Sequence, residues 1–219
     1  MTSHIVEAVA GRAAISKQQT EKVIALLDQG NTVPFIARYR KEETGSLDEV
    51  QIKAVEDAYS YVKGLEQRKE EVIRLIDEQG KLDDELKKAI ESATVLQRIE
   101  DLYRPFKQKR RTRAMVAIES GLEPLANELL KFSSSVPEEF AKPFINEEAN
   151  IHSVEDALAG ARDIIAERFA DDAALREDIR KKTWADGTII STIRKGAEDE
   201  RSVYGNYYEY EEPLKKIVP

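Results

Sequence analysis

The residues best suited to chemistry lie in one short basic run, Arg104–Arg113, inside a chain that is otherwise acidic. Six of its ten residues are Lys or Arg and none is acidic, whereas the 219-residue chain carries a formal net charge of −8. Arg offers phosphate oxygens a planar fork of donors, and Lys offers a compact charge. The run predicts contacts to nucleic-acid phosphates, with cations at Arg104, Lys107, Lys109, Arg110, Arg111 and Arg113 and possible base-stacking rings at Tyr103 and Phe106.

A second interpretation of the same run stays open. The chain has 42 Asp and Glu residues, so the cations could instead pair with acids of neighbouring helices. Charge alone does not specify a partner. The two interpretations predict different proteins: a module that binds nucleic acid, or a helical scaffold that binds only protein and keeps the basic run paired inside the fold.

A smaller basic patch is formed by Arg38, Arg40 and Lys41. Glu42 and Glu43 follow at once, and exposed charge pairs of this kind contribute little free energy. The pattern favours a solvated helix end, and we keep the patch as a secondary candidate for phosphate contacts.

Residue patterns typical of catalysis or metal binding do not occur. There is no Cys, and His4 and His152 lie far apart in the sequence, which argues against a zinc site. Glycine-rich phosphate loops, nucleophile elbows and H-E-x-x-H motifs are also missing. We therefore expect no enzymatic activity, no cofactor and no metal.

Composition indicates a cytoplasmic protein that does not meet a membrane. Charged residues make up 35% of the chain, a surplus that suits long, solvated helices. No stretch approaches the roughly 20 apolar residues of a membrane span, and the N-terminus does not resemble a signal peptide. The lack of Cys fits a reducing compartment.

Apolar spacing predicts an all-α fold, an elongated array of many helices. The longest periodic segment covers about residues 47–79, and a capping box over Ser46–Glu49 opens it. Residues 188–193 are β-branched, so they predict either one short strand or a helical turn. Pro105 disfavours helix at Arg104, which makes the basic run a connector between two helices.

Capping residues predict the helices that position this connector. Thr112 caps residues 113–120, directly after the basic run. Ser153 opens a helix to about Phe169, and Asp171 or Asp172 caps the one that follows.

The chain divides into four expected parts. Residues 1–45 are helical and helix-turn-helix-like, and residues 46–132 hold the long helix, helical hairpins and the basic connector. Residues 133–197 form a second helical subdomain, and residues 198–219 an acidic tail rich in Tyr. We expect this tail to dock on a basic partner surface or on further domains beyond Pro219, or else to be a packed helix face.

Three blocks of the sequence resemble the N-terminal region of the bacterial Tex proteins. They are Thr32–Glu42, Leu102–Ala114 and Gly121–Ala126, and they occur in the order found in that family. Tex proteins are transcription accessory factors similar in core architecture to a eukaryotic elongation factor. One departure is Phe106, which stands where many relatives have Tyr.

The resemblance implies a non-catalytic helical module of a transcription accessory protein. It implies RNA or DNA, and RNA polymerase or other transcription machinery, as partners, without distinguishing among them. Family members continue with a nuclease-like domain, a helix-hairpin-helix unit and an S1 domain, so it also implies that an S1 domain outside this sequence contributes to nucleic-acid binding.

Overall fold

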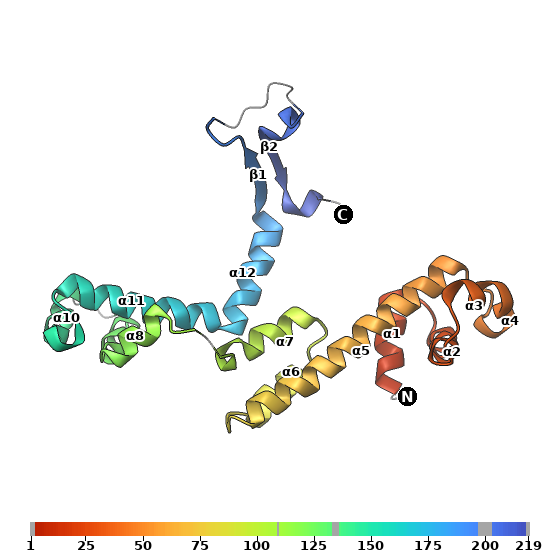
Figure 1. Cartoon of the computed structure of the whole chain (residues 1–219), viewed down its shortest axis with the longest axis horizontal. Coiled ribbons are helices and arrows are strands. Elements are labelled where there is room, and N and C mark those ends of the chain that lie inside the picture. The colour runs from red at the N-terminus through yellow and green to blue at the C-terminus, as the bar shows by residue number, and fades with distance from the viewer. Residues whose placement is uncertain (1–2, 109, 133–135, 197–202, 218–219) are drawn as a thin grey trace. The chain divides into compact units, whose positions relative to one another are not determined.

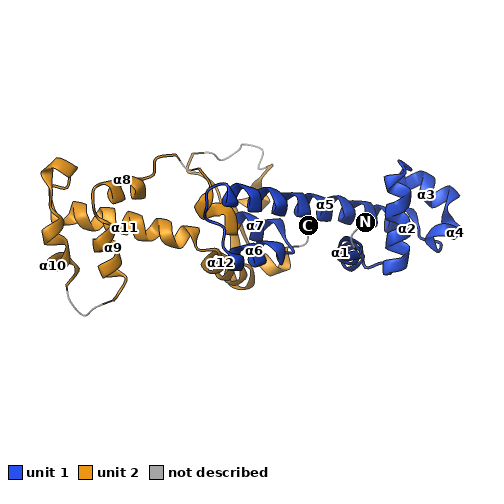
Figure 2. Cartoon of the chain, turned by 90° about the horizontal axis from the view of Figure 1, so that it is seen from below, with its two compact units in different colours: residues 1–100 blue, residues 101–219 orange. Residues whose placement is uncertain are grey.

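The computed structural model describes residues 3–108, 110–132, 136–196 and 203–217. The chain forms two compact units, Met1–Glu100 and Asp101–Pro219 (Figure 2). Within the described residues it is helical apart from one two-stranded sheet (Figure 1). The predicted helical fold is confirmed. None of the described helices combines the length and the apolar character that a membrane span requires.

Unit 1 is built on one long helix, α5 (Glu49–Asp77), which confirms the predicted segment. Its apolar stripe is buried from Ile52 to Ile76. Three N-terminal helices pack against it and share its core, and two shorter helices complete the unit. The bounds are α1 Ser3–Ala13, α2 Lys17–Asp28, α3 Val33–Tyr39, α4 Lys41–Thr44 and α6 Asp84–Glu91.

The capping box of α5 is formed by Asp48 and Gln51, so the prediction of Ser46 as the capping residue is wrong. The Asp48 carboxylate accepts from the Gln51 N–H at 2.8 Å, and the Gln51 side chain accepts from the Asp48 N–H at 3.0 Å. Ser46 has a φ of 64°, as part of the left-handed turn that ends α4 at Gly45. That backbone conformation belongs to a turn and not to the extended residue that precedes a helix.

Unit 2 is built on α11 (Val154–Asp171), and α7 (Leu96–Tyr103) leads the chain into it. The five residues with the lowest exposure in its core are Leu125, Ala126, Ala141, Ala157 and Ala161. Shorter helices pack around α11, and α12 follows it after a single residue. The bounds are α8 Arg113–Glu119, α9 Glu123–Leu129, α10 Pro137–Ala141 and α12 Ala173–Asp186, with 3₁₀ turns at Lys142–Phe144 (η2), Glu147–Ala149 (η3), Gly205–Tyr207 (η4) and Leu214–Lys216 (η5).

The caps predicted for unit 2 are confirmed. Thr112 accepts from the Met115 N–H at 3.1 Å, and Ser153 accepts from the Asp156 N–H at 3.1 Å. Asp172, one of the two candidates, caps α12.

The residues after α12 form a hairpin-like sheet. Strand β1 (Thr188–Thr192) pairs antiparallel with β2 (Glu209–Pro213), with Ile190 opposite Glu211. The short strand at 188–193 is confirmed. The alternative of a packed helix face for the tail is wrong for residues 209–213, which are extended because β1 needs a partner strand. Residues 197–202 of this region lie outside the described residues, and the four-part division of the chain stays a prediction.

Candidate nucleic-acid interface

The predicted basic run lies between α7 and α8. Its first residues, Arg104–Phe106, form a 3₁₀ turn (η1) in which the Lys107 N–H donates to the Arg104 carbonyl at 3.4 Å. The described residues that follow are not helical until Thr112 caps α8. Lys109 lies outside the described residues. We call Arg104–Arg113 the basic connector.

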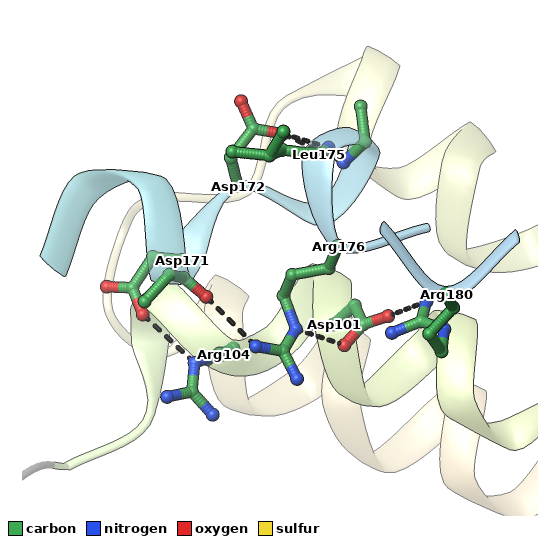
Figure 3. Close-up of polar contacts among 9 residues, drawn as sticks. Asp101, Arg104, Asp171, Asp172, Leu175, Arg176 and Arg180 are labelled. Atoms are coloured by element: carbon green, nitrogen blue, oxygen red, sulfur yellow. Dashed lines mark hydrogen bonds and ion pairs between the residues drawn. The ribbon is translucent and has the colours of Figure 1, made fainter. Parts of the chain in front are cut away.

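The first end of the basic connector is held by an acid–arginine cluster (Figure 3). The side chain of Asp101, on α7, is 1% exposed. It accepts from the Arg176 Nε at 2.7 Å and from a guanidinium nitrogen of Arg180, both on α12. Arg104 pairs with Asp171 at 3.2 Å. Because a buried carboxylate is stable only when it is paired and hydrogen-bonded, the cluster fixes the last turn of α7 to α12.

The second end rests on α11. The Thr112 hydroxyl, which caps α8, donates to the Glu167 carboxylate at 2.7 Å. Arg113 pairs with Asp163 at 3.4 Å. Both ends of the basic connector are therefore attached to α11 or α12, and the described cations between them, Lys107, Arg110 and Arg111, are exposed.

Three cations of the basic connector are paired with acids but remain in solvent. Arg111 is 70% exposed although its guanidinium lies 2.6 Å from Glu119, and Arg113 is 88% exposed beside Asp163. Arg104 is 45% exposed. Exposed pairs of this kind contribute about 0–1 kcal/mol, so an incoming phosphate can replace the carboxylate at little free-energy cost.

The other described cations of the basic connector are also exposed. Arg110 makes no hydrogen bond or ion pair with any described residue. The Lys107 ammonium lies 5.4 Å from the centroid of the Tyr103 ring. Tyr103 and Phe106 are both half-buried, so each ring presents only part of its surface to a base. Their stacking role stays a prediction.

Two hollows border the basic connector within unit 2. A groove of about 690 Å³ has Arg111 and Arg113 on its wall, and the side chains of Val116, Leu122 and Ile151 add apolar surface. A smaller hollow of about 260 Å³ is lined by Pro105, Lys107 and residues of α8 and α11. Four acids also line the groove, and two of them, Glu119 and Asp163, pair with its two arginines. Its lining therefore carries more negative than positive charge, the other two acids being Glu148 and Asp156.

The secondary patch lies at the junction of α3 and α4: Arg38 is in the last turn of α3, Arg40 lies between the helices, and Lys41 begins α4. Arg40 pairs with Glu43 three residues on at 3.3 Å, and its guanidinium lies 5.4 Å from the Phe35 ring centroid. Arg38 and Lys41 are exposed. Arg40 is thus paired with an acid only three residues away in the sequence.

Sequence reasoning missed the acids and arginines that support the basic connector. Asp101 is 75 residues from Arg176 and 79 from Arg180, so no local pattern connects them. One weak signal was available: Arg176 and Arg180 are four residues apart on one helix face, where like charges repel slightly and an anion between them is favourable. Among the described residues there is also no group of three or more His, Cys, Asp or Glu that could hold a metal ion.

Comparison with known proteins gives the family. Two family models match, the Tex-like protein N-terminal domain over residues 3–77 and the Tex central region-like model over residues 133–219. The chain is 51% identical over 217 residues to the uncharacterized protein YdcI of Bacillus subtilis. The aligned segment covers 96% of this chain and 30% of the relative.

Two further relatives carry the family name. Transcriptional accessory protein Tex of Neisseria gonorrhoeae is 44% identical over 91% of this chain and 26% of its own length. Protein tex of Bordetella pertussis is 41% identical over 98% of this chain and 27% of its own length. The chain thus spans less than a third of the curated relatives it matches. The two matched models and these identities confirm the resemblance found in the sequence, and the chain belongs to the Tex family, of which it carries the N-terminal domain and the central region.

Proposed function

We propose that this chain is a non-catalytic helical module of a Tex transcription accessory protein and that its basic connector contacts the phosphates of RNA or DNA. RNA polymerase or another part of the transcription machinery is the protein partner that such a role predicts. The name of the gonococcal relative, a transcriptional accessory protein, supports the setting. The contact surface itself is proposed from the geometry of unit 2, and a cytoplasmic location follows from the same setting.

The observation that carries the proposal is the exposure of the connector arginines despite their ion pairs. An internal anchoring role would favour burial of the guanidinium groups, as Asp101 is buried between Arg176 and Arg180. Arg111 and Arg113 instead keep most of their surface in water. Each phosphodiester of RNA or DNA carries one negative charge, as a carboxylate does, and offers a guanidinium bidentate acceptors. The strand repeats this charge at close spacing and releases counterions on binding, which favours the contact over an isolated carboxylate.

A protein-only scaffold is the alternative. The pairs from Arg104 to Asp171 and from Arg113 to Asp163 favour it, because both join the connector to α11. In that case the connector would bind no nucleic acid at any salt concentration.

A loss-of-charge experiment separates the two functions. The triple variant Lys107→Gln, Arg110→Gln, Arg111→Gln is compared with Arg38→Gln, Arg40→Gln, Lys41→Gln, which removes the same charge from the secondary patch. Binding of a labelled 20-nucleotide RNA and a 20-base-pair DNA is titrated between low and moderate salt. Removing one cation that touches a phosphate should reduce the slope of log K against log salt by about 0.7–0.9, so the connector triple should lower it by about two to three.

A gain-of-binding experiment tests the same surface from the opposite side. Glu119→Gln and Asp163→Asn each release a connector arginine from its carboxylate and should tighten binding several-fold at low salt. Glu128→Gln is the matched control, because it removes the same charge from an exposed pair with Lys131 at 2.6 Å. Equal effects of all three variants, or wild-type protein that binds neither nucleic acid in low salt, would contradict the proposal.

A further inference from the structure

The β1–β2 sheet of unit 2 has one strand edge that is suited to receive another strand. The sheet has two strands among the described residues, and paired residues of an antiparallel sheet point to the same face. One face therefore carries Thr188, Ile190 and Thr192 of β1 beside Glu209 and Glu211 of β2. Ile190 is 65% exposed there.

The backbone groups at the outer edge of β1 can be assigned from the register. The Leu214 N–H donates to the Gly187 carbonyl at 2.9 Å. Gly187 and Leu214 are therefore a pair of the hydrogen-bonded type in the ladder. Because the two types alternate along an antiparallel ladder, Thr188, Ile190 and Thr192 direct their N–H and C=O groups away from β2. Pro213, which has no N–H, lies opposite Thr188, in agreement with a pair that makes no hydrogen bonds between the two strands. Within the described part of the chain these outward groups have no backbone partner.

The two outer edges of the sheet differ in how they resist pairing. The edge of β2 carries Glu209, Glu211 and Pro213, and charged residues and proline are the devices that keep edge strands from pairing. The edge of β1, Thr188–Thr192, has no charge and no Pro, and four of its five residues are β-branched. Strand addition is therefore favoured at β1 alone.

We infer that the outer edge of β1 binds an extended, basic segment of a partner protein as a third strand. Main-chain hydrogen bonds to Thr188, Ile190 and Thr192 would give affinity, as in other cases of strand addition. Partner residues opposite these three point to the face that carries Glu209 and Glu211. The partner strand and β2 lie about 10 Å apart, with β1 between them. The long side chain of a Lys or Arg bridges that distance over Ile190, so alternate positions of the partner are basic.

The test uses the whole 219-residue chain and an acetylated hexapeptide of alternating Lys and Val. Amide hydrogen exchange is followed by NMR with and without the peptide. Exchange at Thr188, Ile190 and Thr192 should slow about tenfold at saturating peptide, because these amides become hydrogen-bonded. A peptide N-methylated at its Lys residues loses the donors that face β1 and should give no slowing. A peptide N-methylated at its Val residues keeps those donors and should protect the same amides.

A charge variant tests the choice of a basic partner. Glu211→Gln removes a carboxylate from the proposed face and should weaken peptide binding about threefold or more. Glu212→Gln is the matched control, since its position lies on the opposite face and its carboxylate accepts from the Tyr210 hydroxyl.

Four results would overturn the inference. They are equal protection by the Lys-methylated peptide, peptide-induced shifts at other acidic surfaces without protection of the three amides, no binding at millimolar peptide, and protection without peptide that rises with protein concentration. The last would show that a second copy of the chain pairs with the edge.

Discussion

Units 1 and 2 use their charged residues in different ways. Several ion pairs of unit 1 lie within one turn or two of a single helix, such as Lys53 with Glu56 and Arg74 with Glu78. In unit 2, three of the pairs around the basic connector join segments far apart in the sequence: Asp101 with Arg176, Arg104 with Asp171 and Arg113 with Asp163. The difference follows from the helices: α5 buries a long apolar stripe, whereas α12 has no buried residue.

This contrast indicates which interactions hold α5 and α12 to the rest of their own units. α5 is held by apolar burial, and its exposed charged pairs, such as Lys53 with Glu56 and Arg74 with Glu78, contribute little. α12 contributes two arginines to a carboxylate that is almost fully buried. Burial strengthens the electrostatic attraction and raises the free-energy cost of leaving either partner alone. The Asp101 cluster should therefore matter more to stability than any single ion pair of unit 1.

The largest effect is expected for Asp101→Asn. It keeps the size of the side chain but removes the negative charge that Arg176 and Arg180 share, and it should lower the free energy of unfolding of unit 2 by about 2–4 kcal/mol. Urea unfolding followed by fluorescence of Trp184, the sole Trp of the chain, reports on this unit.

The matched control is Glu78→Gln in unit 1, which removes the exposed partner of Arg74. Its effect should stay within about 0.5 kcal/mol. If both variants changed stability equally, the contrast between buried and exposed pairs would be lost.

A second large effect is expected for Gly160→Ala in α11. An added Cβ would lie 2.3 Å from the Leu122 Cδ1 and 3.3 Å from the Ala117 Cβ. Leu122 is buried in the core of unit 2, so it has little room to move, and the substitution should destabilise unit 2 by about 1–3 kcal/mol. Thermal unfolding measures the effect. A Leu122→Ala background removes the closest clash and leaves the 3.3 Å approach to the Ala117 Cβ, so the cost of the added methyl should fall. An unchanged cost would contradict the close packing.

The third effect is expected for Glu66→Gln in unit 1, where one charged group is buried after all. The Lys69 ammonium is nearly buried and lies 2.8 Å from the Glu66 carboxylate and 2.8 Å from the Glu91 carbonyl. Burial alone raises the pKa of Glu66, but the hydrogen bonds and charges of Lys69 and His4 outweigh it, so that this pKa lies below its ordinary value.

A lowered carboxyl pKa stabilises the folded state above the ordinary pKa, and this stabilisation is lost as pH falls through the folded pKa. Glu66→Gln should cost about 1–2 kcal/mol near neutral pH. The difference from wild type should begin to shrink once pH falls below the ordinary carboxyl pKa and should vanish as pH falls through the lowered pKa of folded Glu66, where the wild-type carboxyl also becomes neutral. Urea titrations at pH 7, 5 and 3 check this. A difference that grew on acidification would show that the pKa is raised.

The features that could be predicted from sequence are those set by neighbouring residues. Thr112, Ser153 and Asp172 cap helices because a short side chain accepts from an N–H two or three residues ahead. The 29-residue α5 follows from its own apolar spacing and from Gly80 beyond its end. The position of the basic connector between two helices depends on Pro105 and Thr112, which both belong to the connector.

The features that could not be predicted depend on residues distant in the sequence. Strand β2 is specified by its register with β1, and its five residues contain three Glu and a Pro, which do not favour strand on their own. The burial of Asp101 depends on arginines of α12, and the exposure of Arg111 and Arg113 depends on how α8 packs on α11. The candidate site was therefore located by sequence, but its carboxylate competitors, Glu119 and Asp163, required the structure.

The smallest effect is expected for Gly64→Ala, and it should have the opposite sign to Gly160→Ala. Gly64 lies inside α5, and an added Cβ would meet no atom within 4 Å. Ala restricts the unfolded chain and favours helix over Gly by about 0.5–1 kcal/mol, so the variant should be more stable than wild type. Circular dichroism through the thermal transition gives the sign directly. The chemical change is the same in both helices. A Gly64→Ala variant less stable than wild type would therefore show that a group outside unit 1 covers α5 at this position.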